Sequence, residues 1–215
     1  YVTGPMFTPP SIRGDGPNDT RGTIQLPGSQ GGSDVQGGAF DPETGILYIP
    51  SITSPFVADI VEGNPDRTNL NYVKGSRQWI GGPRGLPLFK PPYGRVTAID
   101  MNRGEIVWMT PNGDGPRNHP AIRHLNLEPL GTPGRPAPLL TKTLLFLGEG
   151  STNRPGGSRV MDGMPPEIVT NYGGRLFRAY DKATGAEVGE VYMPASVSGS
   201  PMTYMHDGAQ YIVLA

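Results

Sequence analysis

The pattern Ala-x-Asp-x-x-x-Gly occurs three times in the chain and limits its fold more than any other sequence feature. The copies begin at Ala39, Ala98 and Ala179. An apolar or alternating run precedes each copy and another follows it, which is typical of two strands joined by a tight turn. In such a turn the Asp side chain accepts hydrogen bonds from backbone N–H groups, and the Gly provides a positive φ. We therefore expect these Asp residues to be structural and not to bind metal; they are Asp41, Asp100 and Asp181.

The distances between the copies indicate insertions within a repeated β-architecture. Successive copies begin 59 and 81 residues apart, whereas a four-stranded propeller blade needs roughly 40–50 residues. Polar stretches rich in Gly and Pro account for the extra length; they cover 60–90, 111–138 and 151–172. The expected strands lie at 45–50, 94–100, 105–109, 139–147, 174–180, 189–192, 200–205 and 210–215. The last two are joined by His206-Asp207-Gly208, which predicts a hairpin turn.

These patterns predict an all-β fold, a partial β-propeller of about three to four four-stranded blades. Gly (32 residues) and Pro (25) are abundant enough to suggest disorder. Apolar runs such as 144–147 and 211–214 recur, however, and nine Tyr and six Phe can fill a packed core. We expect one propeller unit over 1–215, with repeats around 39–49, 98–108 and 179–189.

The two ends of the chain suggest a piece of a longer protein. The chain begins with Tyr1 and ends at Ala215, inside an expected strand. The strand edges of a partial propeller must pair with other strands or be covered. We therefore expect a homo-oligomer to form through the exposed blade edges.

Composition excludes several classes of function. The 18 Lys and Arg residues balance the 19 Asp and Glu residues, so the chain lacks the positive field that nucleic-acid binding needs. The absence of Cys excludes disulfides, thiol catalysis, Cys-ligated metals and covalently attached haem. No apolar stretch approaches the ~20 residues that span a bilayer, and no targeting segment opens the chain. We expect no nucleic-acid partner and no membrane span in this segment.

A few side chains outside the turns have a pattern that could indicate function. Trp108 ends a full Ala-x-Asp-x-x-x-Gly-x-x-x-Trp copy, and this repeat position predicts docking between neighbouring blades. His119 and His124 lie five residues apart, which fits neither a helical zinc pair nor a strand pair, so we do not expect a metal site. Glu149 follows an apolar strand, where propeller loops often meet ligands, but a structural role is favoured.

Longer segments resemble a known family. The repeat that ends at Trp108 resembles the tryptophan-docking repeat of the quinoprotein dehydrogenases, which are eight-bladed propellers that bind pyrroloquinoline quinone (PQQ). Four segments look like the C-terminal part of the membrane-bound glucose dehydrogenase branch of that family; they are 7–11, 37–45, 90–100 and 199–204. The resemblance covers almost the whole chain apart from the insertions.

The resemblance implies a PQQ-dependent oxidoreductase that oxidises a glucose-like sugar or another alcohol. It implies that hydride passes to the quinone of PQQ, that calcium polarises this quinone, and that electrons continue to a quinone or cytochrome acceptor in the periplasm. The family's catalytic base and calcium ligands lie upstream of the matched region. No catalytic or metal-binding residue is therefore assigned in this chain, and the 215 residues alone are expected to be inactive.

One cofactor contact of the family falls inside the chain. The family loop before the first repeat carries a polar residue near the quinone, followed by Trp; Asp34 and Val35 occupy these positions here. The resemblance therefore implies that Asp34 faces PQQ. The alternative is a non-catalytic propeller that serves as an interaction scaffold. Val35 favours this alternative, because it lacks the flat surface and the N–H donor of an indole.

Overall fold

The computed structural model describes residues 1–14, 16, 19–28, 31–33, 37–75, 78–150, 174–197 and 199–215, with the backbone alone at 78 and 79. Strands form nearly all of the regular structure in these residues. Their helical segments are three 3₁₀ turns, η1 (Pro83–Gly85), η2 (Gly115–Asn118) and η3 (Arg123–Leu125). The expected all-β class is confirmed. No helix in this part of the chain is long and apolar enough to cross a membrane.

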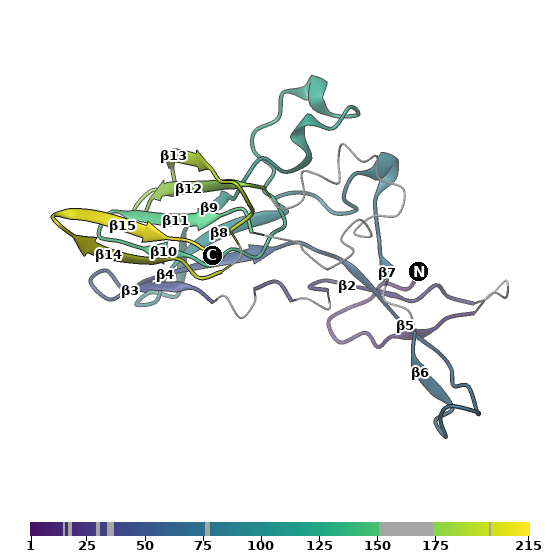
Figure 1. Ribbon diagram of the computed structural model, residues 1–215. Helices are drawn as coiled ribbons and strands as arrows, with labels where there is room; N and C mark the ends of the chain where they lie inside the picture. Colours follow the sequence, from purple (N-terminus) through teal and green to yellow (C-terminus); the bar gives the residue numbers. More distant parts are fainter. Residues whose placement is uncertain are drawn as a thin grey trace.

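Two sheets have the antiparallel four-stranded meander of a propeller blade. The first blade consists of β3 (Ala39–Asp41), β4 (Ile46–Ile52), β8 (Gly94–Asp100) and β9 (Glu105–Pro111). The second blade consists of β10 (Leu139–Leu140), β11 (Leu144–Gly148), β12 (Leu176–Asp181) and β13 (Glu187–Tyr192). A hairpin of β14 (Met202–His206) and β15 (Ala209–Val213) follows. These strands gather on one side of the molecule (Figure 1).

A further sheet, called the inserted sheet, is formed by a segment between β4 and β8 together with two strands from the N-terminal residues. Its central strand, β5 (Phe56–Glu62), pairs with four short strands, β1 (Ser11–Ile12), β2 (Thr23–Gln25), β6 (Tyr72–Lys74) and β7 (Gln78–Trp79). In Figure 1 this inserted sheet lies beside the N-terminus, away from the two blades. The described residues thus contain two complete blades, a hairpin and one inserted sheet, where three to four blades are expected from length alone.

Most expected strands match the structure to within two residues at each end. The strand expected at 94–100 coincides with β8. The stretch 139–147 divides into two strands, because Thr141 and Leu144 close a turn with backbone and hydroxyl hydrogen bonds of 2.8–3.2 Å. The hairpin turn is confirmed, with positive φ at Asp207 (47°) and Gly208 (78°). Strand β5 overlaps the stretch 60–90, where a loop is expected, because pairing with distant segments orders it.

The three repeated turns have the expected structural role. Each Asp carboxylate accepts a hydrogen bond from the backbone N–H two residues later, at 2.8–3.1 Å. Each Gly has a φ of 70–73°, the left-handed conformation that the absence of Cβ permits. The residues concerned are Asp41, Asp100 and Asp181, and Gly45, Gly104 and Gly185.

Trp108 docks the first blade onto the second, as its repeat position predicts. Its indole Nε1 donates to the carbonyl of Lys182 at 3.2 Å, and the Tyr48 hydroxyl donates to the same carbonyl at 3.1 Å. The ring also lies against Gly185, where an added Cβ would sit 2.6 Å from Cε3. Six fully or nearly fully buried residues continue this contact into a core shared by the blades; they are Tyr48, Val96, Ala98, Leu145, Leu147 and Tyr180.

An ion pair also joins the blades at this junction. Lys182 Nζ donates to Asp41 Oδ2 at 2.6 Å, and the two side chains are 15% and 4% exposed. The hydrogen bond from Lys182, followed by that from Thr44, holds the pKa of Asp41 below its ordinary value of 3.8. Because the folded-state pKa is lowered, the stabilisation is complete above the ordinary carboxyl pKa and is lost as the pH falls through the folded value.

We therefore expect the wild-type chain to lose stability in acid more steeply than a Lys182→Met variant. The variant removes the group that lowers the Asp41 pKa, so less proton uptake accompanies its unfolding between about pH 5 and about pH 2. Urea unfolding followed at several pH values measures this difference. Lys142→Met, at an exposed lysine, is the matched control. Equal acid dependence in all three chains would contradict the assignment.

Candidate functional site

One end of the two blades carries a buried polar network, and the opposite end carries the three Asp turns. At the polar end Ile52 pairs with Gly94, and Gly148 pairs with Phe177. Asn112 directly follows β9 and Glu149 directly follows β11, so the chain order of the blades brings both to this end. We define the polar blade end by four buried residues: Asn112, Glu149, Arg178 and Tyr180.

Arg178 is the centre of this network. It lies in β12, and its Nη2 donates to Glu149 Oε1 at 3.0 Å, with both side chains only 6% exposed. Its Nη1 donates to both oxygens of Glu187 at 2.7 and 2.9 Å and to Glu190 at 2.9 Å. Glu187 and Glu190 extend from the neighbouring strand β13, so a single guanidinium contacts three carboxylates.

The carboxylate of Glu149 fits in its place because residues 113 and 174 are glycines. An added Cβ at Gly113 would sit 2.6 Å from Oε1, and one at Gly174 would overlap Oε2. Gly113 also has a φ of 88°, which favours glycine independently. Oε2 accepts one long hydrogen bond, from the backbone N–H of Leu176 at 3.4 Å. The chain therefore fixes the position of this buried carboxylate closely.

Asn112 and Tyr180 join the two blades at the same end. The Tyr180 hydroxyl donates to Asn112 Oδ1 at 2.9 Å, and Asn112 Nδ2 donates to the Gly148 carbonyl at 2.9 Å. Asn112 is 2% exposed, and Tyr180 is fully buried. Because these hydrogen bonds link β9, β11 and β12, they hold the loops of both blades in one arrangement.

The electrostatics of the polar blade end favour fixed protonation states. Burial opposes the charge of Arg178, but the hydrogen bond and the charge of Glu149, followed by the charge of Glu187, raise the pKa of Arg178. Burial, followed by the charge of Glu187, raises the pKa of Tyr180. Burial also raises the pKa of Glu187, although Arg178 offsets part of that rise. With a charged Arg178 and a neutral Tyr180, this network is suited to positioning loops and not to transferring protons.

Asp34, the residue expected to face the cofactor, and Val35 lie outside the described residues. The preceding residues do lie at the polar end, because Gly32 O accepts from the backbone N–H of Ile52 at 2.7 Å and Ser33 Oγ donates to the Pro50 carbonyl at 2.6 Å. The contact between Asp34 and PQQ stays a prediction.

The other candidates have clear surroundings. His119 is 7% exposed, and its Nδ1 accepts from the backbone N–H of Ala121 at 3.0 Å, whereas His124 is exposed. Glu149 has the buried, paired environment of a structural residue, which is the role that the sequence favours. Within the described ranges, no cluster of three or more His, Cys, Asp or Glu residues could hold a metal ion.

Sequence reasoning missed Arg178, Asn112 and Tyr180. One signal for Arg178 was available, because a charged residue in the apolar run Leu176-Phe177-Arg178-Ala179-Tyr180 needs a partner when the strand is buried. The acidic residues of the next strand could supply that partner. Asn112 offered no such signal, since it lies in a Gly- and Pro-rich stretch that reads as a loop.

Comparison with known proteins gives one family over nearly the whole chain. The family model described as "PQQ: Glucose/ethanol/alcohol dehydrogenase, beta-propeller domain" matches residues 1–212. Quinoprotein glucose dehydrogenase A of Acinetobacter calcoaceticus is 24% identical over 97% of this chain and 24% of its own length. The glycerol dehydrogenase large subunit of Gluconobacter thailandicus is 28% identical over 97% of this chain and 28% of its own length. The chain thus spans about a quarter of these relatives.

Solved structures show the same fold. A quinohemoprotein alcohol dehydrogenase (ADHIIG) from Pseudomonas putida HK5 superposes with a TM-score of 0.54 at 18% identity, over 89% of this chain and 23% of that protein. A europium-containing methanol dehydrogenase superposes with a TM-score of 0.54 at 21% identity, over 88% of this chain and 25% of that protein.

Proposed function

The chain belongs to the β-propeller family of PQQ-dependent glucose, ethanol and alcohol dehydrogenases, and from this membership we propose that it serves in an enzyme that oxidises a glucose-like sugar or another alcohol. The supporting observation is the agreement between the family match over 1–212 and the docking of Trp108 onto the second blade. Electrons would pass through PQQ to a quinone or cytochrome acceptor, and the enzyme would act in the periplasm, as the resemblance implies.

The cofactor and its metal need different groups from the protein. PQQ supplies a quinone that accepts two electrons, and the protein orients it. Calcium prefers six to eight oxygen ligands, and the described ranges hold no suitable acidic cluster. These residues therefore do not form a calcium site by themselves. Their proposed contribution is to hold the loops at the polar blade end, where Glu149 and Asn112 are fixed by Arg178 and Tyr180.

Asp34 is the residue that we propose to contact PQQ. Its position follows Ser33, which is anchored at the polar blade end. If the proposal is correct, titration of the purified chain with PQQ and calcium gives saturable 1:1 binding in absorbance and calorimetry. We expect Asp34→Ala to weaken this binding at least tenfold, because a charge-assisted contact contributes about 1.5–3 kcal/mol. Asp66→Ala, at an exposed aspartate, is the matched control and is expected to bind as the wild type does.

Measurements of dehydrogenase activity distinguish the proposed enzyme from the alternative, a non-catalytic propeller that serves as a scaffold. We expect the 215 residues alone to reduce no artificial acceptor with sugars or alcohols, because the family's base and calcium ligands lie upstream by resemblance. A longer chain that carries these residues is expected to do so with PQQ and calcium. If neither chain binds PQQ, the scaffold is favoured.

Light scattering of the 215-residue chain tests the proposed oligomer through the exposed edges of β13 and β15, and a stable monomer would argue against it.

A further inference from the structure

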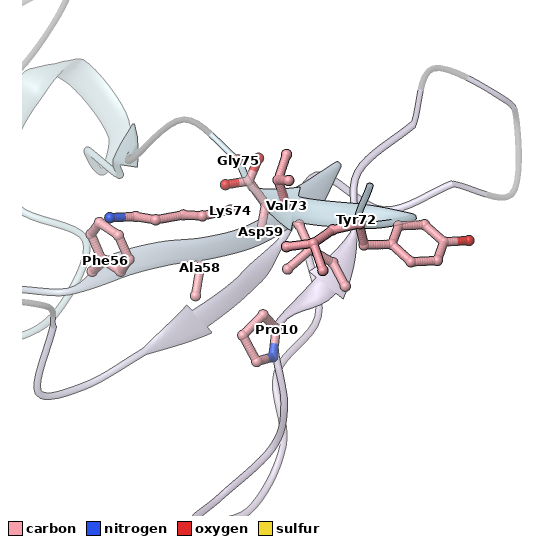
Figure 2. Close-up of a pocket in the computed structure, with 10 residues that line it drawn as sticks. Pro10, Phe56, Ala58, Asp59, Tyr72, Val73, Lys74 and Gly75 are labelled. Atoms are coloured by element: carbon pink, nitrogen blue, oxygen red, sulfur yellow. The ribbon is translucent and has the colours of Figure 1, made fainter. Parts of the chain in front are cut away.

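One face of the inserted sheet is hollowed into an apolar groove. Side chains alternate along a strand, and paired residues of neighbouring strands share a face. Phe56, Ala58 and Ile60 of β5 therefore lie on one face, and Lys74 joins them because it pairs with Ile60. The groove has a volume of about 510 Å³, and its lining includes Phe56, Ala58, Asp59, Leu70, Tyr72 and Lys74 (Figure 2).

The lining is mostly apolar and includes two charged residues, Lys74 and Asp59. Phe56 is 6% exposed and forms part of the floor, whereas Leu70 (60%) and Tyr72 (46%) are exposed. The carboxylate of Asp59 lies on the opposite side of β5 from Ala58 (Figure 2), and its Oδ2 lies 3.1 Å from Arg13 Nη1. The Lys74 side chain extends along the sheet in the direction of Phe56 (Figure 2). Lys74 and Asp59 are thus the two charged residues of the lining, and the Asp59 carboxylate already contacts Arg13.

This lining discriminates between the two kinds of molecule that the proposed enzyme would handle. A sugar needs many hydrogen-bonding partners, and a groove of Phe, Ala, Ile, Leu and Val offers few. A quinone has a flat ring that packs on aromatic side chains and two carbonyls that accept hydrogen bonds. The volume lies within the ~300–1,000 Å³ of small-molecule sites, and Lys74 can donate to a quinone carbonyl.

We infer that this groove binds the quinone electron acceptor, an inference that rests on the proposed function. The place of the groove in the fold supports it. The chain leaves the first blade after β4, forms β5, β6 and β7 of the inserted sheet, and returns at β8, at the same end as Asn112 and Glu149. A quinone in the groove would therefore lie on an extension of the first blade that starts at its polar end.

Calorimetric titration of the 215-residue chain with decylubiquinone, without PQQ, tests the inference. We expect saturable binding that Ala58→Trp weakens at least tenfold by filling the groove, and that Lys74→Met weakens severalfold by removing the carbonyl donor. Leu70→Asp, at an exposed residue, should also weaken binding, and it keeps the test valid if Ala58→Trp does not fold. Val107→Trp is the control, because Val107 is 52% exposed on β9 and lies outside the groove.

Several results would overturn the inference. Equal binding by wild type, Ala58→Trp and Leu70→Asp would place the quinone elsewhere, and absence of wild-type binding would exclude it. Equal binding of 1-decanol would show that the groove takes any apolar chain. A dimer that Leu70→Asp dissociates would assign the groove to a second copy. Because no PQQ is present, these outcomes are independent of the Asp34 titration.

Discussion

Arg178→Met is expected to lower the free energy of unfolding by about 3–5 kcal/mol, the usual effect of breaking a buried ion pair from one side. The substitution keeps most of the side-chain volume but leaves Glu149 as a buried carboxylate without its cation. Glu187 and Glu190, both on β13, lose the same partner and then repel each other. Urea unfolding, followed by tryptophan fluorescence, measures the change.

Two further variants separate the buried charge from other effects. The double variant Glu149→Gln/Arg178→Met removes both buried charges, so we expect it to recover part of the lost stability. Arg103→Met breaks the exposed pair of Arg103 with Glu105, whose side chains are 68% and 60% exposed, and is expected to cost less than about 1 kcal/mol. If Arg178→Met and Arg103→Met destabilise the chain equally, the network has no buried electrostatic role.

The parts of the fold that were predictable from sequence depend on local chemistry. An Asp that caps its own turn and a Gly with positive φ act within five residues, so the turn at Asp100 could be identified without knowing what lies beside it. The hairpin at Asp207-Gly208 follows from the same kind of local preference. The docking of Trp108 was predictable because the repeat fixes its place in the first blade.

The parts that were not predictable depend on partners distant in sequence. Strand β5 is ordered by pairing with β1 and β2, which lie more than thirty residues earlier in the chain. Asn112 reads as a loop residue, and only the approach of Tyr180 and the Gly148 carbonyl gives it two buried hydrogen bonds. Arg178 likewise depends on Glu149, which follows β11. The polar blade end could not be predicted from single segments, although each of its residues belongs to an ordinary strand or loop.

Trp108→Ala is the second substitution with a large expected effect, a loss of about 3 kcal/mol in the free energy of unfolding. The indole joins the blades through its packing on Gly185 and Tyr48 and through its hydrogen bond to the Lys182 carbonyl. Alanine removes all three contacts and leaves a cavity at the junction. Trp108→Phe keeps an aromatic ring but loses the N–H donor, so we expect a loss of about 1–2 kcal/mol. Thermal or urea unfolding by circular dichroism measures both, since Trp108 itself contributes to fluorescence.

The repeated turns provide a matched test of whether the docked indole, and not the conformation of the turn, holds the two blades together. Gly185 and Gly104 have nearly the same φ, 73° and 70°, so alanine strains the backbone equally at both. An added Cβ would lie 2.6 Å from the Trp108 ring at Gly185 and would meet nothing within 4 Å at Gly104. We therefore expect Gly185→Ala to destabilise the chain more than Gly104→Ala. In a Trp108→Ala background this difference should disappear, because the ring that the Cβ would strike is gone. A difference that persists without the indole would show that the second blade is held at this turn by something other than Trp108.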